Sequence, residues 1–285
     1  MFVAVGHNGL RLTSANGLEW ANQQLGKEGE VFRAVAFGNG VFAAVGSFGG
    51  RNMTAATRDG VEWKLGGNDA KYSRYFRGLV FGGGKFLALG GDPGTVGAAK
   101  PFVSTSADGV EWSELKDIGG KFIIRRVAVG NERFVGVGDR GRRAFSKDGL
   151  VWEDAPNTKP IDTLVDIAFG NGTFVGVGLH GLRMTTTDGV TWSEPMRGQE
   201  GEHLNSIVWA QNRFVAVGAG ATWISPDAVK WERQPNQDAP LNCVFGGGAF
   251  IGSMWKGRIL RSTDGVRWTQ VFKSEYHVEA LAAGN

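Results

Sequence analysis

Short apolar segments alternate with polar turns along the whole chain, and the same order of segments recurs. One unit reads VDIAFG, TFVGVG, LRMTTT and VTWSE within residues 165–194, and NG, LHG and DG stand between these segments. Apolar runs of four to eight residues bounded by Gly and Asn are typical of β-strands. Each unit therefore predicts four short strands, which we call a, b, c and d in chain order.

The apolar content of the strands indicates how deeply each is buried. Strand b is apolar throughout and recurs as FVAVG (2–6), FAAVG (42–46), FLALG (86–90), FVGVG (134–138 and 174–178), FVAVG (214–218) and FIGS (250–253). Strands that are buried on both faces have this composition. Strand d carries charged residues beside a Trp, as in EWKL and EWSEL, which predicts an outer strand with one edge in water.

A seven-residue motif, Ser/Thr-x-Asp-Gly-x-x-Trp, marks the passage from strand c to strand d. It occurs with small variations at 14–20, 57–63, 106–112, 146–152, 186–192, 225–231 and 262–268. Asp-Gly is a favoured two-residue hairpin turn, and we expect the Ser/Thr hydroxyl and the Asp carboxylate to bond to nearby backbone. We expect the Trp to pack between neighbouring blades. Asn16 replaces the Asp of the first motif and Ala228 the Gly of the sixth, so these two turns are predicted to be weaker.

The two ends of the chain together complete one unit. Residues 1–24 supply strands b, c and d with no strand a before them, and VEALAAGN at 278–285 supplies a strand a with nothing after it. The motif period of about 40 residues indicates blades or solenoid turns, but a solenoid would need polar caps at both ends. We predict a single domain over residues 1–285, an all-β seven-bladed β-propeller of four-stranded antiparallel blades. Strand a near 277–284 closes the ring on strands b, c and d near 1–24.

The repeated motif also resembles a known family. The Ser/Thr-x-Asp-Gly-x-x-Trp units resemble the Asp-box (BNR-like) motif of sialidase-like propellers, shortened by one residue between Asp and Trp. The surrounding AFGNGTFVGVG pattern is similar to propellers of the photosystem II assembly-factor-like type. The resemblance covers the whole chain and implies the propeller fold more directly than an activity, because the sialidases of such families have six blades.

Composition narrows the class of protein. The chain has 46 Gly and 42% hydrophobic residues, and no apolar run approaches the roughly 18 residues of a membrane span. Its start, MFVAVGHNG, already reads as a strand, so we expect a cytosolic protein, or a secreted or periplasmic one whose signal has been removed. The single Cys243 allows no internal disulfide. A net charge of +3 suits an acidic partner but not a dedicated nucleic-acid binder. We expect a monomer without a cofactor.

The candidate site lies among the more variable loops. The a-to-b and c-to-d turns are short and uniform, whereas the d-to-a and b-to-c connections vary and must share the opposite face, where binding residues usually lie. Arg33, Arg77 and Arg125 take the same position in strand a of three successive units, where the others have Val165, Asn205, Leu241 and Glu279. Together with the nearby loop arginines Arg51, Arg140 and Arg142, they predict an anion site at the channel mouth. The alternative is that each Arg covers a blade edge and pairs locally.

Other residues of these loops allow further interpretations. Tyr276 with Glu279 and Asp92 could supply the nucleophile and acids of a sialidase-type mechanism. His7 and His180 are weak candidates for a metal site, since their b-to-c loops belong to distant blades. Exposed aromatic rings could stack on sugars or anchor a peptide; the candidates are Trp255, Trp223, Phe48, Tyr72 and Tyr75.

The sequence therefore favours a rigid binding module without enzymatic activity. Its partner would be an anionic or carbohydrate ligand or a protein, held on the loop-bearing face. The first alternative is a glycoside hydrolase or polysaccharide lyase acting on acidic glycans. The second is a purely structural or assembly scaffold, which would present a contiguous apolar patch and no small-ligand pocket.

Overall fold

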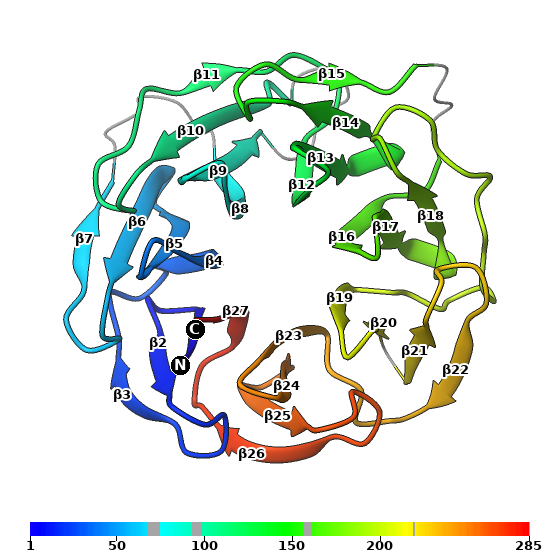
Figure 1. Cartoon of the computed structure of the whole chain (residues 1–285). Coiled ribbons are helices and arrows are strands. Elements are labelled where there is room, and N and C mark those ends of the chain that lie inside the picture. Colours follow the sequence, from blue (N-terminus) through cyan, green and yellow to red (C-terminus); the bar gives the residue numbers. More distant parts are fainter. Residues whose placement is uncertain (68–74, 93–98, 157–160, 219, 285) are drawn as a thin grey trace.

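The computed structural model describes residues 1–67, 75–92, 99–156, 161–218 and 220–284, which form seven antiparallel sheets in a ring around a central channel (Figure 1). Each sheet is one blade, and we number the blades from the one that contains the N-terminus. The predicted seven-bladed β-propeller is confirmed. Among these residues, no helix is long and apolar enough to cross a membrane.

Each blade runs outward from the channel in the order a, b, c, d. The a strands are β27 (Val278–Ala283), β4 (Val31–Gly38), β8 (Tyr75–Gly82), β12 (Ile124–Gly130), β16 (Leu164–Gly170), β19 (Ser206–Ala210) and β23 (Asn242–Gly246). The b strands are β1 (Phe2–Gly6), β5 (Val41–Phe48), β9 (Lys85–Gly91), β13 (Arg133–Gly138), β17 (Thr173–Gly178), β20 (Arg213–Gly218) and β24 (Ala249–Met254). The c strands are β2 (Arg11–Ser14), β6 (Arg51–Thr57), β10 (Phe102–Ser106), β14 (Arg143–Ser146), β18 (Arg183–Thr186), β21 (Ala221–Ser225) and β25 (Arg258–Ser262). The d strands are β3 (Ala21–Gln24), β7 (Lys64–Gly66), β11 (Lys116–Asp117), β15 (Glu153–Asp154), β22 (Glu232–Pro235) and β26 (Thr269–Lys273). Two short 3-10 turns, η1 (Asp139–Gly141) and η2 (Leu179–Gly181), lie in b-to-c loops.

The outer strand is the least regular part of each blade. Six sheets have four strands, but the sheet of blade 5 has three, and its fourth position is reduced to a bridge between Arg183 and Met196. Pro195 precedes Met196 and has no N–H to offer a ladder. The amide of Ser193 donates to Thr185 O at 2.9 Å, so this edge of the sheet is still partly covered.

The two termini close the ring as the sequence predicts. Strand β27 pairs with β1 in an antiparallel register that sets Phe2 opposite Ala283 and Ala4 opposite Leu281. The N-terminal ammonium of Met1 donates to Gly284 O at 3.0 Å, and the amide of Gly284 donates to Met1 O at 2.8 Å. Blade 1 is therefore built from both ends of the chain.

The repeated motif forms a capped turn rather than the predicted two-residue hairpin. In blade 4, Ser146 Oγ accepts from the amide of Gly149 at 2.8 Å, and Asp148 Oδ1 accepts from Leu150 and Val151 amides at 2.8 and 2.9 Å. The two-residue prediction is wrong because these bonds hold a longer loop, and β15 begins only after Trp152. The backbone donors lower the pKa of Asp148.

The Gly and the Trp of the motif join neighbouring blades. Gly149 has φ +76°, and a Cβ built on it would lie 2.0 Å from Leu87 Cδ2 of blade 3. Trp152 is buried in the apolar cluster between blades 3 and 4, and its indole Nε1 donates to Gly149 O at 2.9 Å. The motif requires Gly for its positive φ and for this close approach.

The two variant motifs keep the same turn. In the first, Asn16 Oδ1 accepts from the amides of Leu18 and Glu19 at 2.8 and 3.1 Å, as the Asp carboxylate does elsewhere. In the sixth, buried Ala228 adopts φ +63°, a conformation that costs a residue with a Cβ. That these turns are weaker remains a prediction.

Candidate functional site

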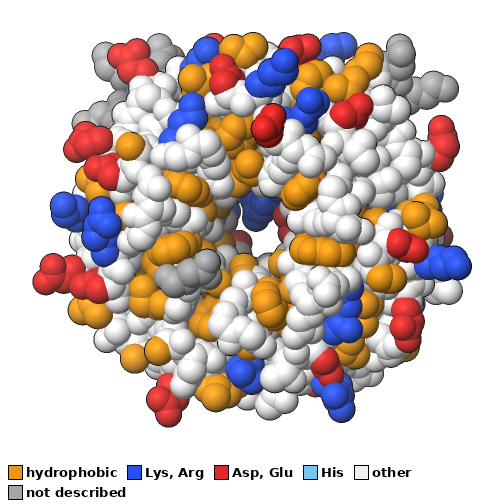
Figure 2. Space-filling model, viewed as in Figure 1, with side chains coloured by type: hydrophobic (Ala, Val, Ile, Leu, Met, Phe, Trp, Pro, Cys, Tyr) orange, Lys and Arg blue, Asp and Glu red, His pale blue; other side chains and the backbone are white. Residues whose placement is uncertain are grey.

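The connections between strands separate onto the two ends of the ring. Because each blade is an up-and-down sheet, the a-to-b and c-to-d turns share one face, and the b-to-c and d-to-a loops share the other. We call these the turn face and the loop face. Figure 2 shows the channel open at the centre of the ring, with basic side chains visible inside it.

A β-bulge near the loop face turns one side chain of each of five inner strands out of the ladder. In β4, Phe32 pairs with Gly46 and Ala34 with Val45, so Arg33 is the extra residue. The same shift leaves one residue unpaired in four more inner strands, at Arg77, Arg125, Val165 and Glu279. A bulge bends its strand and re-aims a side chain. These are five of the seven positions that the sequence alignment of the a strands brought together.

The bulges depend on the Gly that ends strand b. A Cβ on Gly46 would lie 2.0 Å from Val31 O, and one on Gly90 would lie 2.0 Å from Tyr75 O. The backbone of the bulged strand can approach this closely only where no Cβ stands. Blade 7 has Ser253 instead of Gly, and its strands β23 and β24 pair without a shift. The final Gly of FVxVG therefore permits these bulges but does not specify them alone, because blade 6 has Gly218 and its strands β19 and β20 pair without a shift.

The five bulged residues line one cavity in the channel, of about 200 Å³. Arg33, Arg77 and Arg125 come from blades 2, 3 and 4, and the lining is completed by Arg126, Val165 and Glu279. We call this the arginine cavity. The structure thus brings together the three arginines that the sequence placed in register. Asn205 and Leu241 are not among the residues that line it.

Like charges lie close together in the arginine cavity. The pKa of Arg77 is lowered, first by burial and then by the charges of Arg33 and Arg125 on either side. Arg125 Nε forms an ion pair with Asp139 Oδ1, whose charge partly opposes this shift. The Nε atoms of Arg33 and Arg77 are buried and have no hydrogen-bond acceptor among the described residues. Buried donors of this kind need an acceptor such as water or an anion, and Arg213 Nε and Arg261 Nε outside the cavity share this property.

The one carboxylate that lines the cavity among the described residues, Glu279, is paired with a histidine. Glu279 Oε1 lies 2.8 Å from His7 Nε2, and the ring of His7 packs edge-on against that of His277 at 5.4 Å. His277 stacks on Trp255 at 4.7 Å with an interplanar angle of 17°. Trp255 is 65% exposed. Burial lowers the pKa of His277; the charge of Glu279 opposes this shift, and that of His7 adds to it.

Next to the bulges, polar side chains join the inner strands of neighbouring blades. Arg126 Nη1 donates to Arg77 O of the preceding blade at 2.9 Å. Asp166 accepts from the amides of Ile167 and Ile207, each at 2.9 Å. Ser206 Oγ and Asn242 Nδ2 make the next two links, to the Cys243 amide at 3.3 Å and to Glu279 O at 3.0 Å. Burial raises the pKa of Asp166 despite the nearby charge of Arg126.

A second cavity of about 240 Å³ opens beside the arginine cavity at the loop face. It shares Arg33 and Arg77 with it and is also lined by Phe48 and Tyr75. Phe48 is 37% exposed. Two of the aromatic residues predicted for a binding surface thus border the arginines. Trp223 instead lies under Arg183, whose guanidinium carbon is 4.6 Å from the ring centroid, and Tyr72 lies outside the described residues.

The other predicted loop arginines do not line the arginine cavity. Arg142 is buried, its Nε lies 2.8 Å from Asp154 Oδ1, and its Nη1 donates to Phe122 O at 2.5 Å. This is the local pairing that the sequence analysis named as the alternative. Arg140 is exposed in η1 with φ 53°, and Arg51 is exposed at the start of β6.

The predicted catalytic and metal residues are dispersed. Of the three acid and nucleophile candidates, only Glu279 lines the arginine cavity. Tyr276 packs on the apolar cluster of blades 7 and 1, and Asp92 follows β9, where its amide donates to Ala99 O at 2.7 Å. His180 packs against His203 at 5.3 Å in blade 5, whereas His7 lies in blade 1. Within the described part of the chain, no group of three or more metal-ligating side chains forms.

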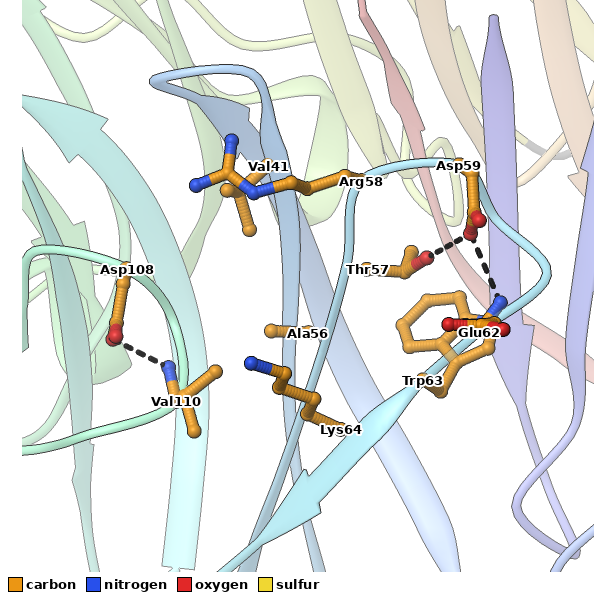
Figure 3. A pocket seen from close by; sticks show the side chains of 10 residues that line it. All are labelled: Val41, Ala56, Thr57, Arg58, Asp59, Glu62, Trp63, Lys64, Asp108 and Val110. Carbon is orange, nitrogen blue, oxygen red and sulfur yellow. Dashed lines mark hydrogen bonds between the residues drawn. The ribbon is translucent and has the colours of Figure 1, made fainter.

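A groove of about 390 Å³ on the turn face, between blades 2 and 3, was not predicted (Figure 3). Its floor includes Ala56, at a position where strand c of blade 4 has Phe145. Asp59 and Asp108 line it, but their carboxylates already accept backbone amides, such as Val61 N at 2.8 Å and Val110 N at 2.9 Å. Arg58 and Lys64 lie at its rim (Figure 3). The small side chain in strand c is the signal that could have found it.

Comparison with known proteins identifies the fold. No protein-family model matches the chain, and no curated protein matches it in sequence. Among solved structures it is similar to YCF48 bound to D1 peptide, with TM-score 0.63 and 20% identity over 85% of this chain and 81% of that chain. It is also similar to YCF48 from Cyanidioschyzon merolae, with TM-score 0.61 and 17% identity over 85% of both chains. The computationally designed Ika8 protein matches with TM-score 0.62 and 13% identity over 99% of this chain and 90% of that chain. These similarities agree with the predicted propeller fold.

Proposed function

We propose that this chain is a rigid binding module that holds an acidic group of a protein partner in the arginine cavity. The observation that carries the proposal is the convergence of Arg33, Arg77 and Arg125 on one cavity by three equivalent bulges. Three like charges side by side cost free energy unless an anion offsets them. The buried Nε donors of Arg33 and Arg77 supply hydrogen bonds for such a group.

The size and surroundings of the cavity support a side chain or chain end rather than a large ligand. A volume of about 200 Å³ suits a carboxylate, sulfate or phosphate group with a few attached atoms. Phe48 and Tyr75 border the neighbouring cavity and Trp255 is exposed on the same face, so apolar parts of a protein would find aromatic contacts beside the anion. The solved relative YCF48 bound to D1 peptide is a propeller of this shape with a peptide ligand, which favours a protein partner.

Four narrower hypotheses accompany this proposal. A carbohydrate with acidic groups would satisfy the same arginines, and a hydrolase or lyase acting on such glycans remains the alternative. An assembly scaffold is compatible with the same surface. We also propose that the seven capped turns are shortened Asp-boxes, because each pairs a hydroxyl and an Asp or Asn with a following Trp.

Removal of the three cavity arginines tests the proposal. The variant Arg33→Ala/Arg77→Ala/Arg125→Ala should bind an acidic peptide and a sulfated oligosaccharide at least roughly tenfold more weakly at low salt. The matched control, Arg51→Ala/Arg58→Ala/Arg140→Ala, loses the same charge from exposed positions outside the cavity and should stay within about threefold of the parent. Calorimetric titration of both probes measures this. Equal losses in the two variants would show that general charge, and not the cavity, binds anions.

A further inference from the structure

The arginine cavity contains one carboxylate, and that carboxylate is tied to a titratable ring. Glu279 lines the cavity with Arg33, Arg77 and Arg125, and its Oε1 lies 2.8 Å from His7 Nε2. Glu279 is positioned for this by its own bulge, which gives it the same place in blade 1 that the arginines have in blades 2 to 4. The anion site and the His7 ring thus share one acidic group.

The charge of a histidine–carboxylate pair changes when the imidazole takes up a proton. An imidazole ordinarily titrates near pH 6.5. While His7 is neutral, Glu279 contributes a negative charge that opposes an incoming anion. Once His7 is protonated, the pair is neutral as a whole, and the three guanidinium groups act on the anion without that opposition.

We propose that His7 and Glu279 form an acid-sensitive regulator of the arginine cavity, which binds anions more tightly as the pH falls. The inference rests on the proposed function, since it concerns the same cavity. The groups that face His7 are Glu279 from β27 and His277 from the preceding loop. The start of β4 also lies beside it, since Val31 forms a bridge with His7, and Glu30 and Arg33 stand on either side of Val31. His277, stacked on Trp255, forms the outer side of the cluster.

Blade 5 provides a natural control for this device. Its b-to-c loop carries His180, which packs edge-on against His203 at 5.3 Å much as His7 packs against His277 at 5.4 Å. The bulged position of blade 5, however, holds Val165 instead of Glu279. The carboxylate that interacts with His180 is Asp162, which pairs with Arg197 and does not line the arginine cavity, so the His180 pair should leave anion binding unchanged.

Inorganic sulfate is the probe, because it stays a dianion between about pH 5.5 and 8 and cannot itself cause a pH effect over the range in which histidine titrates. Nuclear magnetic resonance titration of the Arg Nε–H signals measures its affinity at both ends of this range. We expect the unmodified protein to bind sulfate roughly three- to tenfold more tightly at the acid end. By reciprocity, saturating sulfate should move the midpoint of the His7 titration to higher pH.

Two substitutions should separate the members of the pair: His7→Gln should remove the pH dependence, whereas Glu279→Gln should raise the affinity at the alkaline end of the range. Glu279→Gln removes the opposing charge, so sulfate should bind as tightly at about pH 8 as it does to the unmodified protein at about pH 5.5. His7→Gln can still donate to Glu279 but cannot be protonated, so binding should stay at the weaker level throughout. His180→Gln should keep the full pH dependence.

The outcomes separate this inference from the proposed function. Sulfate binding that depends on the three arginines but does not change with pH, together with an unmoved His7 titration, overturns the regulator and leaves the anion site intact. Sulfate binding that is equally weak at both pH values and unchanged in the triple arginine variant overturns the anion site, and the regulator with it.

Discussion

The inner ring of the propeller has two halves that use the same strand position in different ways. In blades 1 to 4 the bulged residue is charged, and Ala280, Ala34 and Gly78 follow it in the first three of them. In blades 5 to 7 the corresponding residues are uncharged, and the next residue is the polar Asp166, Ser206 or Asn242 that bonds to a neighbouring blade. One half places charged side chains in the channel cavity, and the other uses its polar groups to join neighbouring blades.

This difference shows how a repeated scaffold carries a site at one place only. All seven blades satisfy the same packing rules through their capped turns and buried Trp or Phe side chains. The site arises where the residues that face the channel are not used by the protein itself. Arg126 lies at the boundary, since it lines the cavity and also donates to Arg77 O.

The largest expected effect concerns the half that holds the ring together. Asp166→Leu should lower the free energy of unfolding by about 2–3 kcal/mol, because the amides of Ile167 and Ile207 lose their acceptor in an enclosed place. Urea denaturation measures this, with Asp166→Asn, which keeps one acceptor oxygen, as the milder control. A stable Asp166→Leu protein that failed to bind anions would contradict the division into two halves.

Replacing a charged residue by Leu in the other half should change the free energy of unfolding in the opposite direction. Arg77→Leu should raise the free energy of unfolding by about 0.5–1 kcal/mol, because burial and the like charges of Arg33 and Arg125 destabilise the charged Arg77 side chain in the folded protein. Water screens part of this effect. It should also weaken sulfate binding by roughly tenfold. Loss of stability on removing Arg77 would show that the arginines support the fold, and the comparison would fail.

The smallest effect is a dependence of stability on pH in blade 1. The lowered pKa of His277 means that the unfolded chain binds a proton more readily than the folded one. Stability from this residue is therefore complete above about pH 6.5 and is lost as the pH falls through that value towards the folded pKa. We expect a loss below about 1 kcal/mol, because the ring is partly exposed. Thermal denaturation of the parent and His277→Gln from neutral to mildly acid pH should show a smaller slope in the variant.

Much of the fold could be predicted from the sequence because the signals recur seven times. The period of the Trp residues and the split unit at the two ends predicted the closed ring. The predicted two-residue turn was wrong because the Asp148 carboxylate accepts two successive amides and extends the loop to Trp152. That outcome depends on hydrogen-bond geometry, which the spacing of Asp and Gly does not specify.

The candidate site was predictable in part. Aligning strand a brought Arg33, Arg77 and Arg125 into register, but the Gly at the end of strand b permits the bulges on which they lie without specifying them. The burial of Arg142 against Asp154, and the stacking of Trp255 on His277, join residues from separate strands or loops. Such pairings depend on side-chain directions that one sequence does not reveal.

The closure of the ring by β27 has a consequence for biosynthesis. Glu279 belongs to the last strand of the propeller to be synthesised, whereas its partner His7 follows the first. A nascent chain can assemble blades 2 to 7 but cannot finish blade 1 or give the cavity its acidic wall until residue 283 has emerged. The cavity with its acidic wall is therefore complete only when every strand of the propeller has been made, so a partner that contacts Glu279 would distinguish finished from unfinished propellers.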